Sequence, residues 1–348
     1  MNIQELVRPT IAALKPYSSA RNDYQGEASV FLDANENPMN GPYNRYPDPL
    51  QHKLKEKVAT LKQVETSQLF FGNGSDEPID LVYRVFCEPR IDNVVAIDPS
   101  YGMYLVCADI NQVEYRKVLL NKDYTMDADR LLSAVDDKTK VIFLCSPNNP
   151  TGNDLSVSAV KKVLDTFGGI TVIDEAYIDF SARESYLKLL PEYPNLIVLQ
   201  TFSKAWGLAS VRLGMAFAYP EIIGYFNKVK YPYNINILTQ NFVMDELKQP
   251  ERKNSWVKML VKERAVLTEN LKSLTMIRQI HPSDANFVLV KVDDPNAVYH
   301  FLVSQGVIVR NRNTVSLCLG CLRITIGTPE ENAILVEALK KYQALPVA

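Results

Sequence analysis

The 348-residue chain has no long apolar run and no block of like charges. No stretch approaches the roughly 18 consecutive apolar residues that a membrane-spanning helix requires. The N-terminal segment also lacks the apolar core and cleavage site of a signal peptide. With a formal net charge of -2 and no basic cluster, the chain has no electrostatic footprint for nucleic acid. We therefore expect a cytoplasmic protein whose partners are small molecules, with neither nucleic acid nor a membrane among them.

Cysteine is scarce, and the cysteines are scattered. There are five of them, an odd number, at Cys87, Cys107, Cys145, Cys318 and Cys321. Such a set does not resemble the disulfide framework of a secreted domain. Cys318 and Cys321 have the CxxC spacing, but no second pair or nearby histidine completes a zinc site. We therefore expect neither structural disulfides nor a bound metal.

The order of apolar and helical patterns predicts an α/β fold with two domains. A single core rarely serves more than about 300 residues. Between about residues 69 and 219, apolar runs such as NVVAID, KVIFLC, GITVIDE and NLIVLQ alternate with helical patterns, which is typical of a mostly parallel sheet sandwiched by helices. The pattern after Pro232 is typical of a smaller α+β domain, with a long helical stretch over about 237–274 before its strand-like segments. In the N-terminal part, LKPYSSAR is expected to belong to an arm, and VFLDANENP to be a strand that joins the smaller domain. The expected division is an N-terminal arm over 1–28, a large domain over 45–245, and a small domain over 29–44 and 246–348.

Four polar clusters, DPSYGMY, CSPNNPTG, DEAYIDF and TFSK, each begin where an apolar run ends. Functional groups of parallel sheets gather at this edge. Lys204, at the end of NLIVLQTFSK, is placed where an apolar wall and a nearby cation could lower its pKa and let it form a Schiff base. Arg212 and Ser203 could bind a phosphate group beside it. A lysine next to a phosphate site suggests pyridoxal phosphate.

That cofactor needs further partners, and the chain offers a candidate for each. Asp174, at the end of a strand, could hold the pyridine nitrogen protonated, whereas its neighbour Glu175 is expected to be an exposed acid. Tyr177 and Asn149 could donate to the phenolic oxygen, and Tyr101 could stack on the ring. Other interpretations remain open at each place: an exposed strand-end acid, a plain Asn-Pro turn and a core tyrosine.

The segment FGNGSDEPIDL predicts a helix that begins at a phosphate site. Gly72 and Gly74 would allow close approach, and Ser75 and Asp76 would open a helix with its positive end towards the anion. An ordinary helix cap would explain Ser75 and Asp76 but not the paired glycines.

Together, GSDE, SYGMY, SPNNPTG, DEAYIDF and TFSKAWGLASVRLG resemble the aspartate-aminotransferase-like superfamily of fold type I pyridoxal phosphate enzymes. More narrowly, KPYSSAR, LDANENP, RYPDP, CEPRIDNVVAIDPSYGMY and GCLRITIGT are similar to the histidinol-phosphate aminotransferase family. The resemblance covers nearly the whole chain. It implies a homodimer with the active site at the subunit interface. It also implies ping-pong amine transfer between histidinol phosphate and 2-oxoglutarate, with imidazole acetol phosphate and glutamate as products.

The resemblance also assigns roles to individual residues. Lys204 would be the Schiff-base lysine, Asp174 would contact the pyridine nitrogen, Tyr177 and Asn149 the phenolic oxygen, and Tyr101 the ring. The cofactor phosphate would be held by Ser75, Asp76, Ser203 and Arg212, by Tyr46 from the neighbouring subunit, and by Thr201 as a possible further contact.

The anionic substrate group would need cations of its own. Arg323 lies in the strand-like CLRITIG, where an unpaired guanidinium would be costly, so an anionic ligand is a sensible partner. Family resemblance places Arg323 and Arg310 on the substrate side, near Tyr17 and Asn35. Arg312 competes with Arg310 for this role, and we favour Arg310.

Three other functions stay open at this point. A transaminase of the same fold for aromatic amino acids would place a carboxylate at the arginines, and a phosphothreonine-type decarboxylase would keep the phosphate site. A pyridoxal-binding regulator would need a DNA-binding module, and the chain has no basic helix-turn-helix extension that could supply one.

Overall fold

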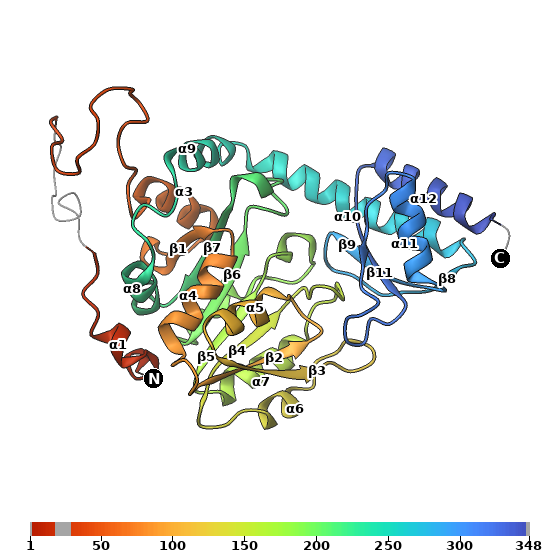
Figure 1. The fold of residues 1–348 in the computed structure, drawn as a ribbon, viewed down its shortest axis with the longest axis horizontal. Coiled ribbons are helices and arrows are strands. Elements are labelled where there is room, and N and C mark those ends of the chain that lie inside the picture. The colour runs from red at the N-terminus through yellow and green to blue at the C-terminus, as the bar shows by residue number, and fades with distance from the viewer. Residues whose placement is uncertain (1, 18–28, 346–348) are drawn as a thin grey trace.

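The computed structural model describes residues 2–17 and 29–345, which form two sheets with helices packed on them (Figure 1). The larger sheet has seven strands in the order β1-β7-β6-β5-β4-β2-β3. Strand β7 is antiparallel to both of its neighbours, and the other pairs are parallel. The strands are β1 (Leu69–Asn73), β2 (Asn93–Asp98), β3 (Glu114–Leu119), β4 (Thr139–Cys145), β5 (Ile170–Asp174), β6 (Leu196–Thr201) and β7 (Leu213–Ala218). The predicted mostly parallel α/β sheet is thus confirmed.

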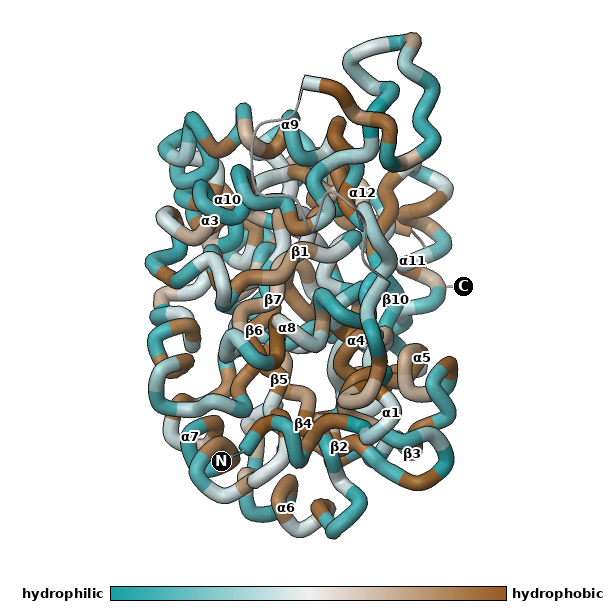
Figure 2. The backbone as a smooth tube through the Cα atoms, turned by 90° about the vertical axis from the view of Figure 1, so that its left-hand side faces the viewer, coloured by the Kyte–Doolittle hydropathy of each residue, from teal (hydrophilic) through white to brown (hydrophobic). Residues whose placement is uncertain are grey.

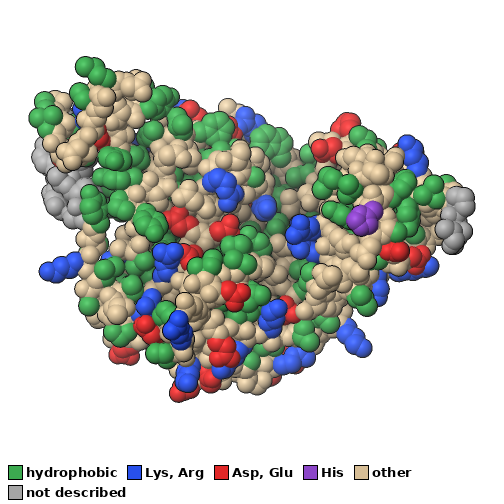
Figure 3. All heavy atoms as spheres, in the orientation of Figure 1, with side chains coloured by type: hydrophobic (Ala, Val, Ile, Leu, Met, Phe, Trp, Pro, Cys, Tyr) green, Lys and Arg blue, Asp and Glu red, His purple; other side chains and the backbone are tan. Residues whose placement is uncertain are grey.

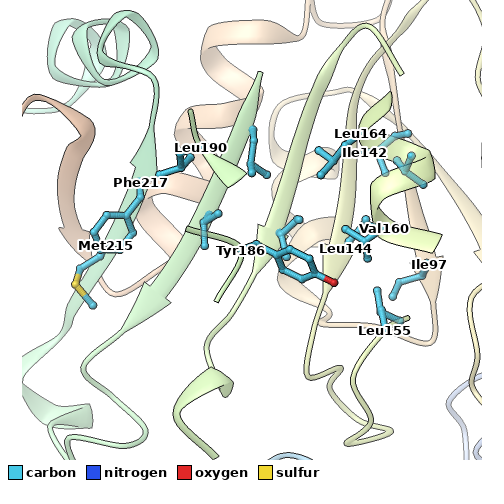
Figure 4. Close-up of a cluster of buried hydrophobic side chains, with 14 of the residues drawn as sticks. Ile97, Ile142, Leu144, Leu155, Val160, Leu164, Tyr186, Leu190, Met215 and Phe217 are labelled. Carbon is cyan, nitrogen blue, oxygen red and sulfur yellow. The ribbon is translucent and has the colours of Figure 1, made fainter. Parts of the chain in front are cut away.

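Successive side chains of the central strands enter two separate cores, one on each face of this sheet. Ile142 and Leu144 belong to one buried cluster (Figure 4), whereas Val141 and Phe143 belong to the other. This alternation follows from the two-residue period of a strand, and both faces are apolar because helices cover both. The covering helices are α1 (Pro9–Ala12), α3 (His52–Lys62), α4 (Asp76–Phe86), α5 (Met103–Ile110), α6 (Ala128–Ser133), α7 (Val157–Thr166), α8 (Pro220–Val229) and α9 (Ile237–Glu246).

A smaller domain follows, with its own core. Its four-stranded antiparallel sheet has the order β10-β11-β9-β8, and its buried cluster draws on both the sheet and the helices beside it. The elements are α10 (Pro250–Lys272), β8 (Ile277–Ile280), β9 (Phe287–Val292), α11 (Pro295–Ser304), β10 (Arg310–Asn311), β11 (Cys321–Thr325) and α12 (Pro329–Gln343). In Figure 2 the apolar segments lie mainly inside the molecule and the hydrophilic ones mainly outside it.

Short 3₁₀ helices connect several of these elements. They are η1 (Ile3–Leu6), η2 (Thr66–Gln68), η3 (Ile178–Phe180), η4 (Tyr186–Leu189) and η5 (Ala209–Val211). Across the described ranges, no helix combines the length and the apolar character that crossing a bilayer would demand.

One expectation about the second domain is wrong. Residues 29–44 form no strand, and they lie beside α8 and α9, at the other end of the molecule from the small sheet (Figure 1). This segment is tied to Arg45, whose Nη1 donates to the backbone oxygen of Phe31 and pairs with Glu36 at 2.8 Å. The helical stretch expected over about 237–274 is present as two helices, because Pro250 starts α10 as a first-turn residue after α9 has ended.

Candidate active site

A cleft lies at the edge of the large sheet where β4, β5 and β6 end. These neighbouring strands are parallel, so their last residues, Cys145, Asp174 and Thr201, reach the same edge. The cleft has an empty volume of about 610 Å³, part of which is open to solvent. Its lining is Gly74, Ser75, Asp76, Tyr101, Cys145, Asn149, Asp174, Ala176, Tyr177, Thr201, Ser203, Lys204, Ala209 and Arg212. Basic and acidic side chains gather in the depression between the two domains (Figure 3).

Lys204 lies three residues beyond the end of β6, and it is half-buried. Its Nζ lies 5.6 Å from the centre of the Tyr177 ring. Burial lowers the pKa of Lys204, and the positive charge of Arg323 lowers it further, against the opposing effect of Asp174. Within residues 2–17 and 29–345, no carboxylate lies close enough to form an ion pair with it. A lysine that loses its proton more readily is a better nucleophile and base.

Asp174 is 3% exposed and has no cationic partner within ion-pair distance among the described residues. Its Oδ2 accepts a hydrogen bond from the Tyr104 hydroxyl at 2.8 Å, and its Oδ1 accepts one from the backbone N–H of Ala176 at 3.0 Å. Burial nevertheless raises the pKa of Asp174 to about 6. A buried carboxylate in this state would be stabilised by a cationic ligand group.

Tyr104 was missed by the sequence analysis, although the motif SYGMY contained it. It is fully buried, stacks on Phe143 with ring centres 4.8 Å apart, and contacts the Tyr101 ring edge to face at 5.6 Å. It therefore fixes both the carboxylate of Asp174 and the ring of Tyr101. The three-residue spacing of the two tyrosines, at the start of a helix, was the signal that could have identified it.

The opposite end of the cleft is formed by the start of α4, as predicted. Ser75 is the residue before its first turn, and Asp76 opens it. Asp76 accepts a hydrogen bond from the Tyr101 hydroxyl at 2.9 Å and lies 3.6 Å from Arg212 Nη2. The backbone N–H groups of this first turn lack partners within the helix, so they favour an anion at this end.

The glycines near this turn make room for protein atoms. Gly74 has φ +71°, and a Cβ on it would lie 2.5 Å from Arg212 Nη2. A Cβ on Gly214 would lie 2.2 Å from the backbone nitrogen of Ser75. The start of α4 can therefore pack directly against β7, and Arg212, in the left-handed region with φ 56°, is held beside it.

The residues of the cleft fit pyridoxal 5'-phosphate. An anion is favoured at the start of α4 beside Arg212, a cation is favoured at Asp174, and Lys204 lies between them as a nucleophile. Every cofactor-binding residue predicted from the sequence lines the cleft except Tyr46.

The two predicted substrate arginines lie in the small domain, next to this cleft. Arg323 is half-buried, its Nη1 donates to Asn149 Oδ1, and its guanidinium lies 5.2 Å from the Phe287 ring centre. Its Nε is buried without a hydrogen-bond partner. Arg310 is opposite Arg323 in the β10–β11 pair and is exposed. In the described part of the chain, neither arginine forms an ion pair with a carboxylate.

Three predicted residues lie outside the cleft of their own chain. Tyr46 stacks on Tyr233 with ring centres 4.5 Å apart. Tyr17 is exposed and lines a different cavity, between the N-terminal segment and the end of α8, which includes Lys228. Asn35 is exposed, in the segment that lies beside α8 and α9.

Glu175 was expected to be exposed, and this expectation is wrong. The residue is 1% exposed and accepts hydrogen bonds from Gln200 Nε2 at 3.0 Å, from the backbone N–H of Tyr186 at 2.9 Å and from the Ser185 hydroxyl. It also pairs with Arg183 Nη1 at 3.1 Å. Asp174 faces the cleft while Glu175 anchors the strand end behind it, since neighbouring residues of an extended chain point in opposite directions.

Replacing Arg183 with methionine should destabilise the enzyme because it leaves the Glu175 carboxylate buried without its cation. We expect a loss of about 3 to 5 kcal/mol, seen as a fall in Tm of at least about 5 °C in differential scanning calorimetry. The matched control is Arg278→Met, which removes an exposed pair with Asp293 and should cost less than about 1 kcal/mol. Equal, small effects of both substitutions would contradict the role of Arg183.

Comparison with known proteins agrees with the fold and the site. The family described as aminotransferase class I and II matches residues 20–339, so the chain belongs to this family. Its members are pyridoxal-phosphate-dependent enzymes. Within it, the chain is 59% identical over 342 residues to a histidinol-phosphate aminotransferase of Bacteroides fragilis, with 98% of this chain and 99% of that protein covered.

Solved structures show the same fold. A histidinol-phosphate aminotransferase of Clostridium acetobutylicum superposes with a TM-score of 0.80 at 22% identity, covering 86% of this chain and 91% of that one. The corresponding protein from Sinorhizobium meliloti, solved in complex with pyridoxal-5'-phosphate, superposes with a TM-score of 0.78 at 23% identity. The superposition covers 87% of this chain and 84% of the Sinorhizobium meliloti chain.

Proposed function

We propose that this chain is a histidinol-phosphate transaminase of histidine biosynthesis, which transfers the amino group of histidinol phosphate to 2-oxoglutarate. The observation that carries the proposal is the unpaired guanidinium of Arg323, half-buried beside a cleft that fits pyridoxal phosphate. A cation in this position calls for an anionic group on the amino donor. The name of the 59% identical relative from Bacteroides fragilis supports a phosphorylated donor.

When bound, pyridoxal phosphate supplies an electron sink that stabilises negative charge at the substrate Cα. Lys204 would tether the cofactor, and its free amine would move the proton from the substrate Cα. Its lowered pKa favours the neutral amine that this role needs. Asp174 would hold a proton at the pyridine nitrogen, and Tyr104 keeps the carboxylate in place. Tyr101, which is anchored on Asp76, would contact the ring.

Asn149 connects the cofactor end of the site to the substrate end. Its side-chain oxygen accepts from Arg323, which leaves the amide N–H₂ as the donor towards the cleft. Tyr177, whose pKa is raised by burial, stays protonated and is a second donor to the phenolic oxygen. Arg323 therefore has two roles, because it orients Asn149 and keeps donors for the substrate anion. The substrate alternates between a phosphate ester and the distal carboxylate of 2-oxoglutarate, and a planar guanidinium can bind both.

We further propose that two chains form a homodimer, in which Tyr46, Tyr17 and Asn35 act at the neighbouring subunit's site. The segment that contains Asn35 exposes much apolar surface: Val30 is 71% exposed and Leu32 is 91% exposed. Apolar surface of this kind is usually covered by a partner. Sedimentation velocity would test the dimer. The five cysteines are all free thiols, which supports a place in the reducing cytoplasm.

An Arg323→Leu variant tests the proposed substrate. We expect kcat/KM for histidinol phosphate to fall about 100-fold, since a charge-assisted hydrogen-bond pair is lost, and kcat/KM for histidinol to change much less. The measurement is a donor panel with 2-oxoglutarate: histidinol phosphate, histidinol, phenylalanine and tyrosine. A parental enzyme that prefers phenylalanine or tyrosine would overturn the proposal in favour of an aromatic amino-acid transaminase. Equal losses of kcat/KM for histidinol phosphate and for histidinol would show that Arg323 does not bind the phosphate group.

A further inference from the structure

We propose that Arg312 is a third cation for the substrate's anionic group, and that it makes this subsite prefer a phosphate monoester to a carboxylate. Arg310 was favoured over Arg312 from the sequence, but both arginines can contact the same anionic group. The inference rests on the proposed function, because it concerns the anionic group of the proposed amino donor.

Arg310, Arg312 and Arg323 share one face of the small sheet. Arg310 is the partner of Arg323 in the antiparallel β10–β11 register. The backbone N–H of Arg312 donates to the carbonyl oxygen of Cys321 at 2.9 Å, so the pairing continues by one step beyond β10. Residues two apart on a strand point to the same face, and so do residues directly opposite on the neighbouring strand.

Arg312 is less exposed than Arg310, and no described residue compensates the charge of its guanidinium. It is half-buried, and its Nε is buried without a hydrogen-bond partner. Over residues 2–17 and 29–345, its side chain forms neither an ion pair nor a hydrogen bond. Burial, followed by the charges of Arg323 and Arg310, lowers the pKa of Arg312 to about 10. A bound anion would relieve both the burial cost and the mutual repulsion.

Arg312 lies at a defined place beside the cleft, because the chain on either side of it is fixed by hydrogen bonds. It shares a face of the sheet with Arg323, whose Nη1 donates to Oδ1 of Asn149 in the lining of the cleft, so this face is turned towards the cleft. The following turn is fixed to the large domain, because the hydroxyl of Tyr124 donates to the carbonyl oxygen of Leu317 at 3.0 Å. Within the turn, Asn313 Oδ1 accepts from the backbone N–H of Gly320 at 2.8 Å. A cation held in this way is part of a formed site.

Charge explains the preference. At pH 7 a phosphate monoester carries between one and two negative charges, since its second pKa is about 6. A carboxylate carries one. Two guanidinium groups already suffice for a carboxylate in a bidentate geometry. A third one adds most to the binding of a group with three terminal oxygens and a second charge.

The test uses the holoenzyme, whose cofactor already fills the phosphate site at α4, and two charge-neutral variants. Arg312→Gln removes the proposed contact, and Arg278→Gln removes an exposed arginine from the same small sheet as the matched control. Inorganic phosphate and acetate are compared as competitive inhibitors against histidinol phosphate at pH 7.5. For Arg312→Gln we expect the inhibition constant of phosphate to rise about tenfold or more, with that of acetate changing less than about threefold. For Arg278→Gln neither should change.

The donor kinetics give the second readout. In Arg312→Gln, KM for histidinol phosphate should rise about tenfold while kcat stays near the parental value, and an Arg312→Lys variant should recover part of the loss. Parallel losses with phosphate and acetate, or an unchanged phosphate constant, would overturn the role of Arg312. If the parental enzyme itself shows no preference for histidinol phosphate over histidinol, the proposed function fails, whatever Arg312→Gln does.

Discussion

Replacing Lys204 with alanine should abolish transamination, with a loss of about 10⁴-fold or more. The residue is expected to supply both the covalent tether and the base that moves the Cα proton, and a positioned base alone is worth about 10² to 10⁴. Among the described residues of the cleft, Tyr177 has its ring centre 5.6 Å from Lys204 Nζ. Its pKa is raised by burial, so it does not act as a base near neutral pH.

Three measurements check this expectation. Transaminase turnover should be lost, and so should the visible absorbance that a lysine-linked cofactor gives. Borohydride reduction followed by peptide mass spectrometry should find the cofactor on Lys204 in the parental enzyme and nowhere in the variant. Lys204→Arg is the matched control, because arginine keeps the charge but neither attacks a carbonyl nor loses its proton. A Lys204→Ala variant that turned over at the parental rate would contradict the assignment.

The sheet and the cleft could be predicted from the sequence because local signals sufficed for them. β5 (ITVID) and β6 (LIVLQT) are mostly apolar, and such runs form strands that are buried on both faces. The motif that follows each run was then bound to reach a common edge, since parallel neighbours end on the same side. Asp174 and Lys204 were therefore brought together by topology alone.

The errors arose where long-range contacts decide the outcome. Glu175 has the sequence context of an exposed acid, but Arg183 and Gln200 bury it, and no local pattern reports on those partners. The apolar residues of 29–44 suggested a strand, yet Val30 and Leu32 are exposed within a single chain. Their burial would depend on a second molecule, and a sequence pattern does not say which surface covers a residue.

Asp174→Asn should reduce kcat/KM about 10³-fold, because asparagine cannot hold the pyridine nitrogen in its protonated form. The shape of the side chain is retained, and asparagine still offers an oxygen to the Tyr104 hydroxyl or to the backbone N–H of Ala176. Cofactor affinity should fall as well, so saturating pyridoxal phosphate should raise the Tm of the variant less than that of the parental enzyme. Activity close to the parental value would contradict the role of Asp174.

Without the cofactor, Asp174→Asn should gain stability relative to the parental protein as pH rises, although it loses activity and cofactor affinity. This gain separates the proposed role of Asp174 from a general loss of stability. The Asp174 carboxyl keeps its proton up to a pKa of about 6 when folded but loses it near 3.8 when unfolded. Between these pH values the folded state binds more protons, so the stability of the parental protein falls as pH rises, by up to about 3 kcal/mol once pH exceeds 6. Asparagine has no such titration. The Tm difference between variant and parent should therefore move in favour of Asp174→Asn between pH 4 and pH 7, measured by calorimetry without cofactor. A difference that is constant with pH would show that the buried carboxylate is already compensated within the protein, and that it has no need of a cationic ligand.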